Sequence, residues 1–93
     1  MEILIKKDNN NTFNVSIKSS INSNHIITLN DDIYIEMTKG VKSKEELIFF
    51  SFKFLLEREK NTLILPKFNL ETIQNYFPEY KNEIQNWINH EKD

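Results

Sequence analysis

Apolar and polar residues alternate in the first third of the chain, from Phe13 onward. The apolar side of this pattern consists of Phe13, Val15, Ile17 and Ile21, and the polar side of Asn14, Ser16, Lys18 and Ser20. A period of two is typical of a strand with one buried and one hydrated face. We therefore expect the apolar side to face the core.

Two shorter β-prone runs, residues 3–6 and 25–29, lie before and after this strand. Asparagine-rich segments at 8–11 and 22–24 separate them from it. Because asparagine tolerates the left-handed backbone that tight turns require, the pattern predicts a three-stranded antiparallel meander.

Residues 30–40 favour a short helix. Asn30, Asp31 and Asp32 offer an N-cap, and Gly40 suits the position that follows the last turn. We therefore expect a helix from Ile33 to Thr38. Residues 33–37 also favour extended structure, so a fourth strand is the alternative.

The strongest local signal is Ser43-Lys44-Glu45-Glu46, a capping box in which Ser43 and Glu46 satisfy each other's backbone amides. The helix that it opens should run to about Lys60. Apolar residues occupy most of its circumference, and the polar ones gather in one narrow stripe: Glu46, Lys53, Glu57 and Lys60. A helix this apolar is either wrapped by its own domain or shared with a second subunit.

The apolar run 63–65 ends at Pro66. Asn69 then offers an N-cap for a short helix through Tyr76-Phe77, and Pro78 suits the first turn of a last helix from Glu79 to about His90. The apolar stripe of this last helix consists of Tyr80, Ile84, Trp87 and Ile88.

Together these elements predict an α+β fold in a single domain, residues 1–93. The β meander occupies residues 1–30. The helical part, residues 31–93, comprises a short helix, a long central helix and two C-terminal helices.

Two distinctive motifs lie in the helical part: Phe52-Lys53-Phe54-Leu55-Leu56-Glu57-Arg58-Glu59 and Tyr76-Phe77-Pro78-Glu79-Tyr80. They are accompanied by Glu45-Glu46-Leu47, Ile64-Leu65, Phe68, Leu70 and Ile73. The whole segment, from Ser43 to Ile84, covers a little under half of the chain and resembles a family of short prokaryotic proteins with no assigned function. The resemblance implies a shared domain, and no activity, cofactor or partner.

The composition is that of a globular domain, with 39% hydrophobic and 28% charged residues and a net charge of −2. Arg58 is the only arginine and Gly40 the only glycine. One arginine leaves little capacity for bidentate binding of phosphate or guanine, and one glycine cannot build a glycine-rich phosphate loop. Nucleic-acid and nucleotide binding are therefore unfavoured. Because there is no cysteine, thiol nucleophiles, disulfides and cysteine-ligated zinc are excluded.

Candidate catalytic groups are few. His25 and His90 lie far apart in sequence and lack metal-ligand spacing, so we assign neither to a metal. Neighbouring carboxylates, such as Asp31-Asp32 and Glu79 with Glu83, are better explained by helix caps and the helix dipole than by an acid–base pair. The serines show no nucleophile elbow. We predict no catalytic, metal-binding or cofactor-binding residue.

Aromatic residues make up 12% of the chain, and most lie between Phe49 and Trp87. They stand at helical spacing beside glutamate rather than lysine. This arrangement favours core packing over stacking on nucleic acid. An aromatic interface with another protein is the alternative.

Arg58 lies outside the polar stripe of the central helix. A guanidinium on the apolar side must find a carboxylate or extend into solvent, and the following segment offers Glu71, Glu79 and Glu83. We predict a structural pair with Glu79 that orients the last helix, because Pro78 fixes the start of that helix. An arginine that captures an anionic ligand is the functional alternative. The predicted structural residues are Arg58, Glu79, Ser43 and Glu46.

The function that these observations favour is protein–protein contact without catalysis, in a small bacterial protein that forms a homodimer. The chain shows no signal peptide and no apolar stretch long enough to span a bilayer, so we expect it in the cytoplasm, without a membrane or cofactor. The first alternative is a small DNA-binding regulator of the antitoxin kind, with residues 43–80 as a helix–turn–helix. The second is a small enzyme with an unrecognised site of carboxylates and His25.

Overall fold

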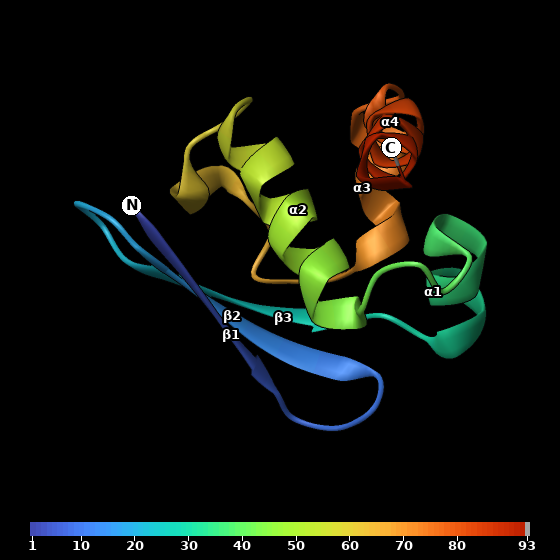
Figure 1. The fold of residues 1–93 in the computed structure, drawn as a ribbon. Coiled ribbons are helices and arrows are strands. Elements are labelled where there is room, and N and C mark those ends of the chain that lie inside the picture. Colours follow the sequence, from blue (N-terminus) through green and yellow to red (C-terminus); the bar gives the residue numbers. More distant parts are fainter. Residues whose placement is uncertain (93) are drawn as a thin grey trace.

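A computed structural model describes residues 1–92 of the chain, with helices packed on one face of a four-stranded sheet (Figure 1). Three strands form an antiparallel meander: β1 (Glu2–Lys7), β2 (Thr12–Lys18) and β3 (Ser23–Thr28). The register places Leu4 opposite Ser16, and Ser16 opposite Asn24. The antiparallel part of the predicted sheet is therefore present.

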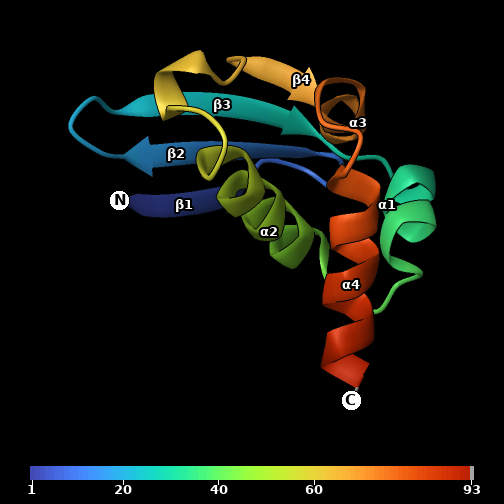
Figure 2. The ribbon, with the colours of Figure 1, turned by 90° about the horizontal axis from the view of Figure 1, so that it is seen from above.

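A fourth strand, β4 (Lys67–Asn69), extends the sheet beyond the predicted meander. It runs parallel to β3, so the sheet is mixed, and β1 and β4 form its two edges (Figure 2). The pairing begins where the Ile26 N–H donates to Pro66 O at 2.8 Å. The prediction of three strands was incomplete because this three-residue strand pairs with a distant segment and has no alternating pattern of its own.

The face assignment of β2 is correct, with one exception. Phe13, Val15 and Ile17 are fully buried, whereas Ile21 is 65% exposed. Ile21 lies in the turn after β2, where Asn22 Oδ1 accepts a hydrogen bond from the Ser19 N–H. The turn therefore comes earlier than predicted, and β3 already begins at Ser23.

The helix α1 (Asp31–Thr38) replaces the alternative of a strand at residues 33–37, which was wrong. Asn30 occupies the N-cap position without a side-chain hydrogen bond. At the other end the left-handed backbone begins at Lys39, with φ of 56°, and continues at Gly40, with φ of 76°. The helix stops here because these residues leave the right-handed region.

The central helix α2 (Lys44–Leu56) starts at the predicted capping box but ends before Lys60. The Arg58 and Glu59 amides both donate to Leu55 O, which tightens the last turn and redirects the chain. Beyond it, a 3₁₀ turn at Asn61–Leu63 brings the buried Asn61 side chain to β3. Local hydrogen bonds thus close the helix, and the contact of Asn61 with Ser23 holds the chain that follows it against β3.

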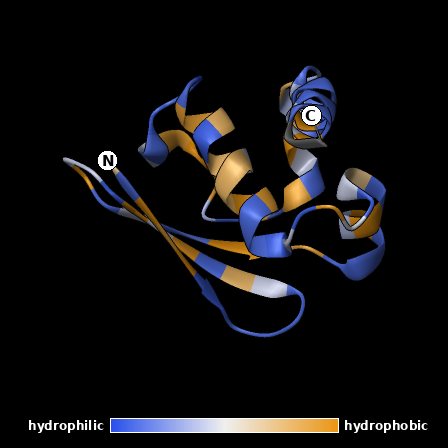
Figure 3. Cartoon of the chain, in the orientation of Figure 1, coloured by the Kyte–Doolittle hydropathy of each residue, from blue (hydrophilic) through white to orange (hydrophobic). Residues whose placement is uncertain are grey.

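The apolar surface of α2 is covered mainly by its own chain. Its exposed residues form one stripe that contains Glu45, Glu46, Phe49, Lys53 and Glu57. The sheet lies beneath the helix, and the C-terminal helices lie beside it (Figures 1 and 2). Apolar residues mark most of its length in Figure 3. The sequence left two alternatives for this helix, burial within its own domain or contact with a second subunit, and the structure supports the first.

The predicted helix after Asn69 is broken into a 3₁₀ turn at Leu70–Thr72 and the single turn α3 (Ile73–Tyr76). The last helix, α4 (Tyr80–Lys92), begins just after Pro78. Its predicted stripe buries Tyr80, Ile84 and Ile88, while the half-buried Trp87 stacks on Phe50 at 4.4 Å. Within residues 1–92, no helix is long and apolar enough to cross a membrane.

Candidate functional site

Arg58 lies in the turn after α2 and contacts the start of α4. Its Nε–H donates to Glu79 Oε2 at 3.1 Å, and Nη1–H donates to Phe54 O at 2.9 Å. Nη2 lies 3.8 Å from Glu83 Oε1, and the guanidinium carbon lies 3.5 Å from the centroid of the Phe54 ring. The arginine is therefore held by groups of its own chain, and its side chain is only 23% exposed.

The electrostatics of this cluster follow from the same contacts. The Glu79 backbone amide and then the Arg58 guanidinium hold the pKa of the Glu79 carboxyl below its usual 4.5. Glu71, the third carboxylate considered for Arg58, instead lines a cavity between α1 and α4. An arginine with these partners ties two helices together and does not present a free guanidinium to an anion.

The capping box is complete at the start of α2. The Glu46 N–H donates to Ser43 Oγ at 3.0 Å, and the Ser43 N–H donates to Glu46 Oε1 at 2.9 Å. The backbone amide and the hydroxyl of Ser43 lower the pKa of the Glu46 carboxyl. Both residues serve the helix start.

His25 forms a buried hydrogen-bond network that the sequence did not reveal. Its Nδ1 lies 2.7 Å from Leu65 O and its Nε2 lies 2.9 Å from Ser23 Oγ. Because a carbonyl only accepts, Nδ1 carries a proton and donates it to Leu65 O. Asn61 Nδ2 donates both to Ser23 Oγ at 2.9 Å and to Ile21 O at 2.8 Å.

This network has the order of a nucleophile, a base and an orienting group. However, His25 is only 2% exposed, and neither His25 nor Ser23 lines any of the cavities described for residues 1–92. Its polar groups instead join β3 to the segment after α2. The arrangement is a structural link, and no local motif around Asn61 signals it.

The remaining candidates for chemistry are dispersed. His90 is exposed near the end of α4, far along the chain from His25. Across the part of the chain that the structure describes, no three His, Cys, Asp or Glu side chains gather closely enough to hold a metal ion. The structure thus brings together no set of protein ligands for a metal among these residues.

An apolar cavity of about 310 Å³ lies between the end of α2, the 3₁₀ turn at Asn61–Leu63, β4 and α3. We call it the apolar cavity; its lining residues are Leu55, Glu59, Leu63, Ile64, Leu65, Phe68, Thr72, Ile73, Tyr76 and Phe77. Leu63, Leu65 and Tyr76 are 67%, 46% and 66% exposed. A volume of this size with apolar walls suits one or two apolar side chains.

The segment 43–80 does not have the geometry of a helix–turn–helix. A 3₁₀ turn and β4 lie between α2 and α3, and α3 has only four residues. A recognition helix must be long enough to lie in a major groove. The DNA-binding alternative therefore lacks the element on which it depends.

Comparison of the chain with protein-family models, with curated proteins and with solved structures gives no match. No functional residue can therefore be transferred from another protein. The function has to be argued from the geometry of this chain, and the apolar cavity is the feature that carries most of that argument.

Proposed function

We propose that this protein acts through contacts with other proteins, as a homodimer, and catalyses no reaction of its own. The observation that carries the contact with other proteins is the apolar cavity with its three exposed rim residues, Leu63, Leu65 and Tyr76. Exposed apolar side chains around a cavity are typical of a binding site, where a partner covers them.

An extended apolar segment of a partner protein fits this location best. β4 is an edge strand of the sheet, and Phe68 in its centre lines the apolar cavity. Because Pro66 O accepts from β3, the next residue, Lys67, directs its N–H and C=O away from β3. A strand added along Lys67 would direct alternate side chains towards the helix-covered side, where the cavity lies.

The charged groups of the cavity favour an apolar occupant over an anion. Glu59 is the one charged residue of its lining, and the single arginine is engaged by Glu79 and Phe54. Neither His25 nor a serine lines the cavity. These features support binding and give no support to catalysis or to phosphate recognition.

The proposal is tested by selecting a displayed library of random peptides on the intact protein. Peptides with apolar residues at alternate positions should be enriched, and they should lose at least about tenfold in affinity for a Leu65→Asp variant. Ile21→Asp is the matched control, because Ile21 is also an exposed apolar residue but lies outside the cavity. The proposal fails if no such peptides are enriched, or if they bind Leu65→Asp and wild type equally.

A further inference from the structure

The outer edge of β1 presents backbone groups at regular intervals. The Asp8 N–H donates to Thr12 O on β2, and the Leu29 N–H donates to Asn11 O. In an antiparallel strand, the backbone groups of successive residues point alternately to the two sides of the strand. Since Asp8 bonds to β2, the even-numbered residues of β1 also bond to β2. The N–H and C=O groups of Ile3 and Ile5 consequently point outward from the sheet.

We propose that two copies of this protein pair through β1, antiparallel, with Leu4 of one copy opposite Leu4 of the other. This inference rests on the homodimer in the proposed function and names its interface. Ile3 of each copy lies opposite Ile5 of the other, and their outward groups form the hydrogen bonds of the new ladder. Two four-stranded sheets thereby become one continuous sheet, with helices on the same face throughout.

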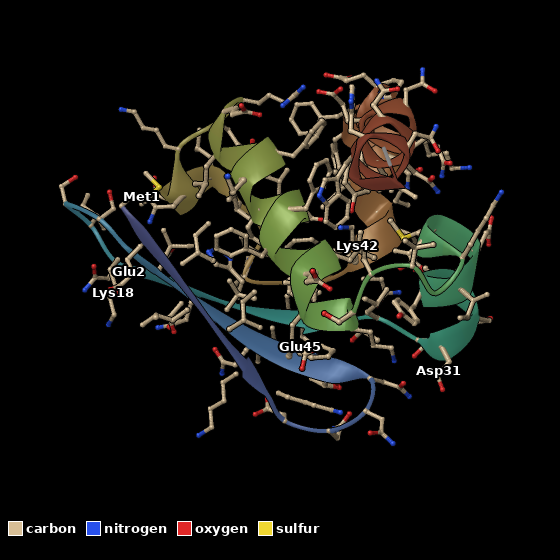
Figure 4. The ribbon with its side chains drawn as sticks, in the orientation of Figure 1. Met1, Glu2, Lys18, Asp31, Lys42 and Glu45 are labelled. Carbon is tan, nitrogen blue, oxygen red and sulfur yellow. The ribbon has the colours of Figure 1, made fainter. Side chains whose placement is uncertain are left out.

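Charge complementarity selects this register. Glu2, Leu4 and Lys6 lie on the face of the sheet that the helices leave uncovered. With Leu4 at the two-fold axis, Glu2 of each copy lies opposite Lys6 of the other, which gives two attractive cross-strand pairs. Figure 4 shows the Glu2 side chain at this edge, beside Lys18 of β2.

Neighbouring registers are less favourable. A shift that places Ile5 at the axis sets Leu4 opposite Lys6 and Ile3 opposite Lys7. A register that sets odd-numbered residues of one copy opposite even-numbered residues of the other would put the helices of the two copies on opposite faces of the sheet. Of these neighbouring registers, the one centred on Leu4 places Lys6 of each copy opposite a carboxylate, that of Glu2.

The same residues explain why a second copy is the occupant. Lysine on an edge strand normally opposes pairing with foreign strands. A second β1 neutralises that charge with its own Glu2 and also covers Leu4, which is 46% exposed, together with the half-buried Ile3 and Ile5. Apolar contact and charge thus favour the same partner.

Charge exchange tests the register directly by sedimentation velocity at micromolar concentrations. Glu2→Lys and Lys6→Glu should each weaken self-association by about tenfold or more, because each sets like charges opposite one another. An equimolar mixture of the two variants should form heterodimers, and the variant carrying both substitutions should dimerise like wild type. Lys67→Glu, at the opposite edge of the sheet, is the matched control.

The outcomes separate this inference from the function on which it rests. A dimer that is insensitive to both charge variants would overturn the β1 interface and leave the homodimer standing. A wild-type protein that stays monomeric would overturn the homodimer and this interface together. Circular dichroism and thermal unfolding confirm that each variant keeps the fold, since Glu2 and Lys6 are both exposed.

Discussion

Tyr80 donates its hydroxyl hydrogen to Ser51 Oγ, 2.5 Å away, in the interior of the protein. The direction follows from a second bond, because the single hydroxyl hydrogen of Ser51 goes to Leu47 O at 2.7 Å. Burial raises the pKa of the Tyr80 hydroxyl far above its ordinary value, so that it remains a donor. The bond connects α4 to the centre of α2.

This directionality predicts unequal effects of removing the two hydroxyl groups. Ser51→Ala should cost about 1–2 kcal/mol, because the buried Tyr80 hydroxyl loses its acceptor. Tyr80→Phe should cost less, since Ser51 still donates to Leu47 O. Adding Tyr80→Phe to Ser51→Ala should raise the stability again, as measured by urea unfolding. If the double variant is less stable than Ser51→Ala, the donor assignment is wrong.

The second prediction concerns Arg58. Arg58→Lys should lower the free energy of unfolding by about 1 kcal/mol. The planar guanidinium donates hydrogen bonds to both Glu79 and Phe54 O and stacks on the Phe54 ring, and a lysine ammonium cannot form this set of contacts. Lys60→Arg, an exposed exchange of the same pair of residue types, is the control and should have little effect. Equal stability of Arg58→Lys and wild type would contradict a role for Arg58 in orienting α4.

The faces of β2 provide a third prediction. Val15→Asp should unfold the domain, because a carboxylate at a fully buried position costs more than about 4 kcal/mol, a large share of the stability of a small domain. Ser16→Asp should cost at most about 1 kcal/mol, since Ser16 lies on the uncovered face, where it contacts Asn24. Thermal unfolding distinguishes them, and similar melting temperatures would refute the face assignment.

The capping box predicts an acid-sensitive part of the stability. The pKa of Glu46 is lower in the folded state than its unperturbed value of 4.5. Its contribution is therefore present above that value and is lost as the pH falls through the folded pKa. Glu46→Gln keeps an acceptor for the Ser43 N–H but cannot titrate, so it should lose less stability than wild type between about pH 5 and 3.

The control for this experiment is Glu45→Gln, which alters a carboxylate in the same helical turn but outside the capping box. This variant keeps the capping box and Glu46, so the acid dependence that Glu46 carries should persist in it. Chemical unfolding at each pH provides the free energies. Identical slopes for Glu46→Gln and wild type would show that Glu46 carries none of the acid dependence.

Contacts between near neighbours in the chain were predictable. The hairpin strands, the capping box and the helix after Asn30 all depend on residues within a few positions of one another. The ion pair of Arg58 with Glu79 was also expected, because few carboxylates follow an arginine on an apolar helix side. By contrast, Asn61 and His25 meet across 36 positions of chain through Ser23, and no periodicity encodes such a contact.

The sequence by itself determined the α+β class, the antiparallel meander and the start of α2, because alternation and helix capping act over short distances. Only the tertiary structure decided the path of the chain after α2 and the parallel pairing of β4 with β3, since both depend on hydrogen bonds to a distant strand. It also decided that α2 is covered by its own chain. The apolar cavity arises from four segments that pack together, so its apolar residues have no common pattern in the sequence.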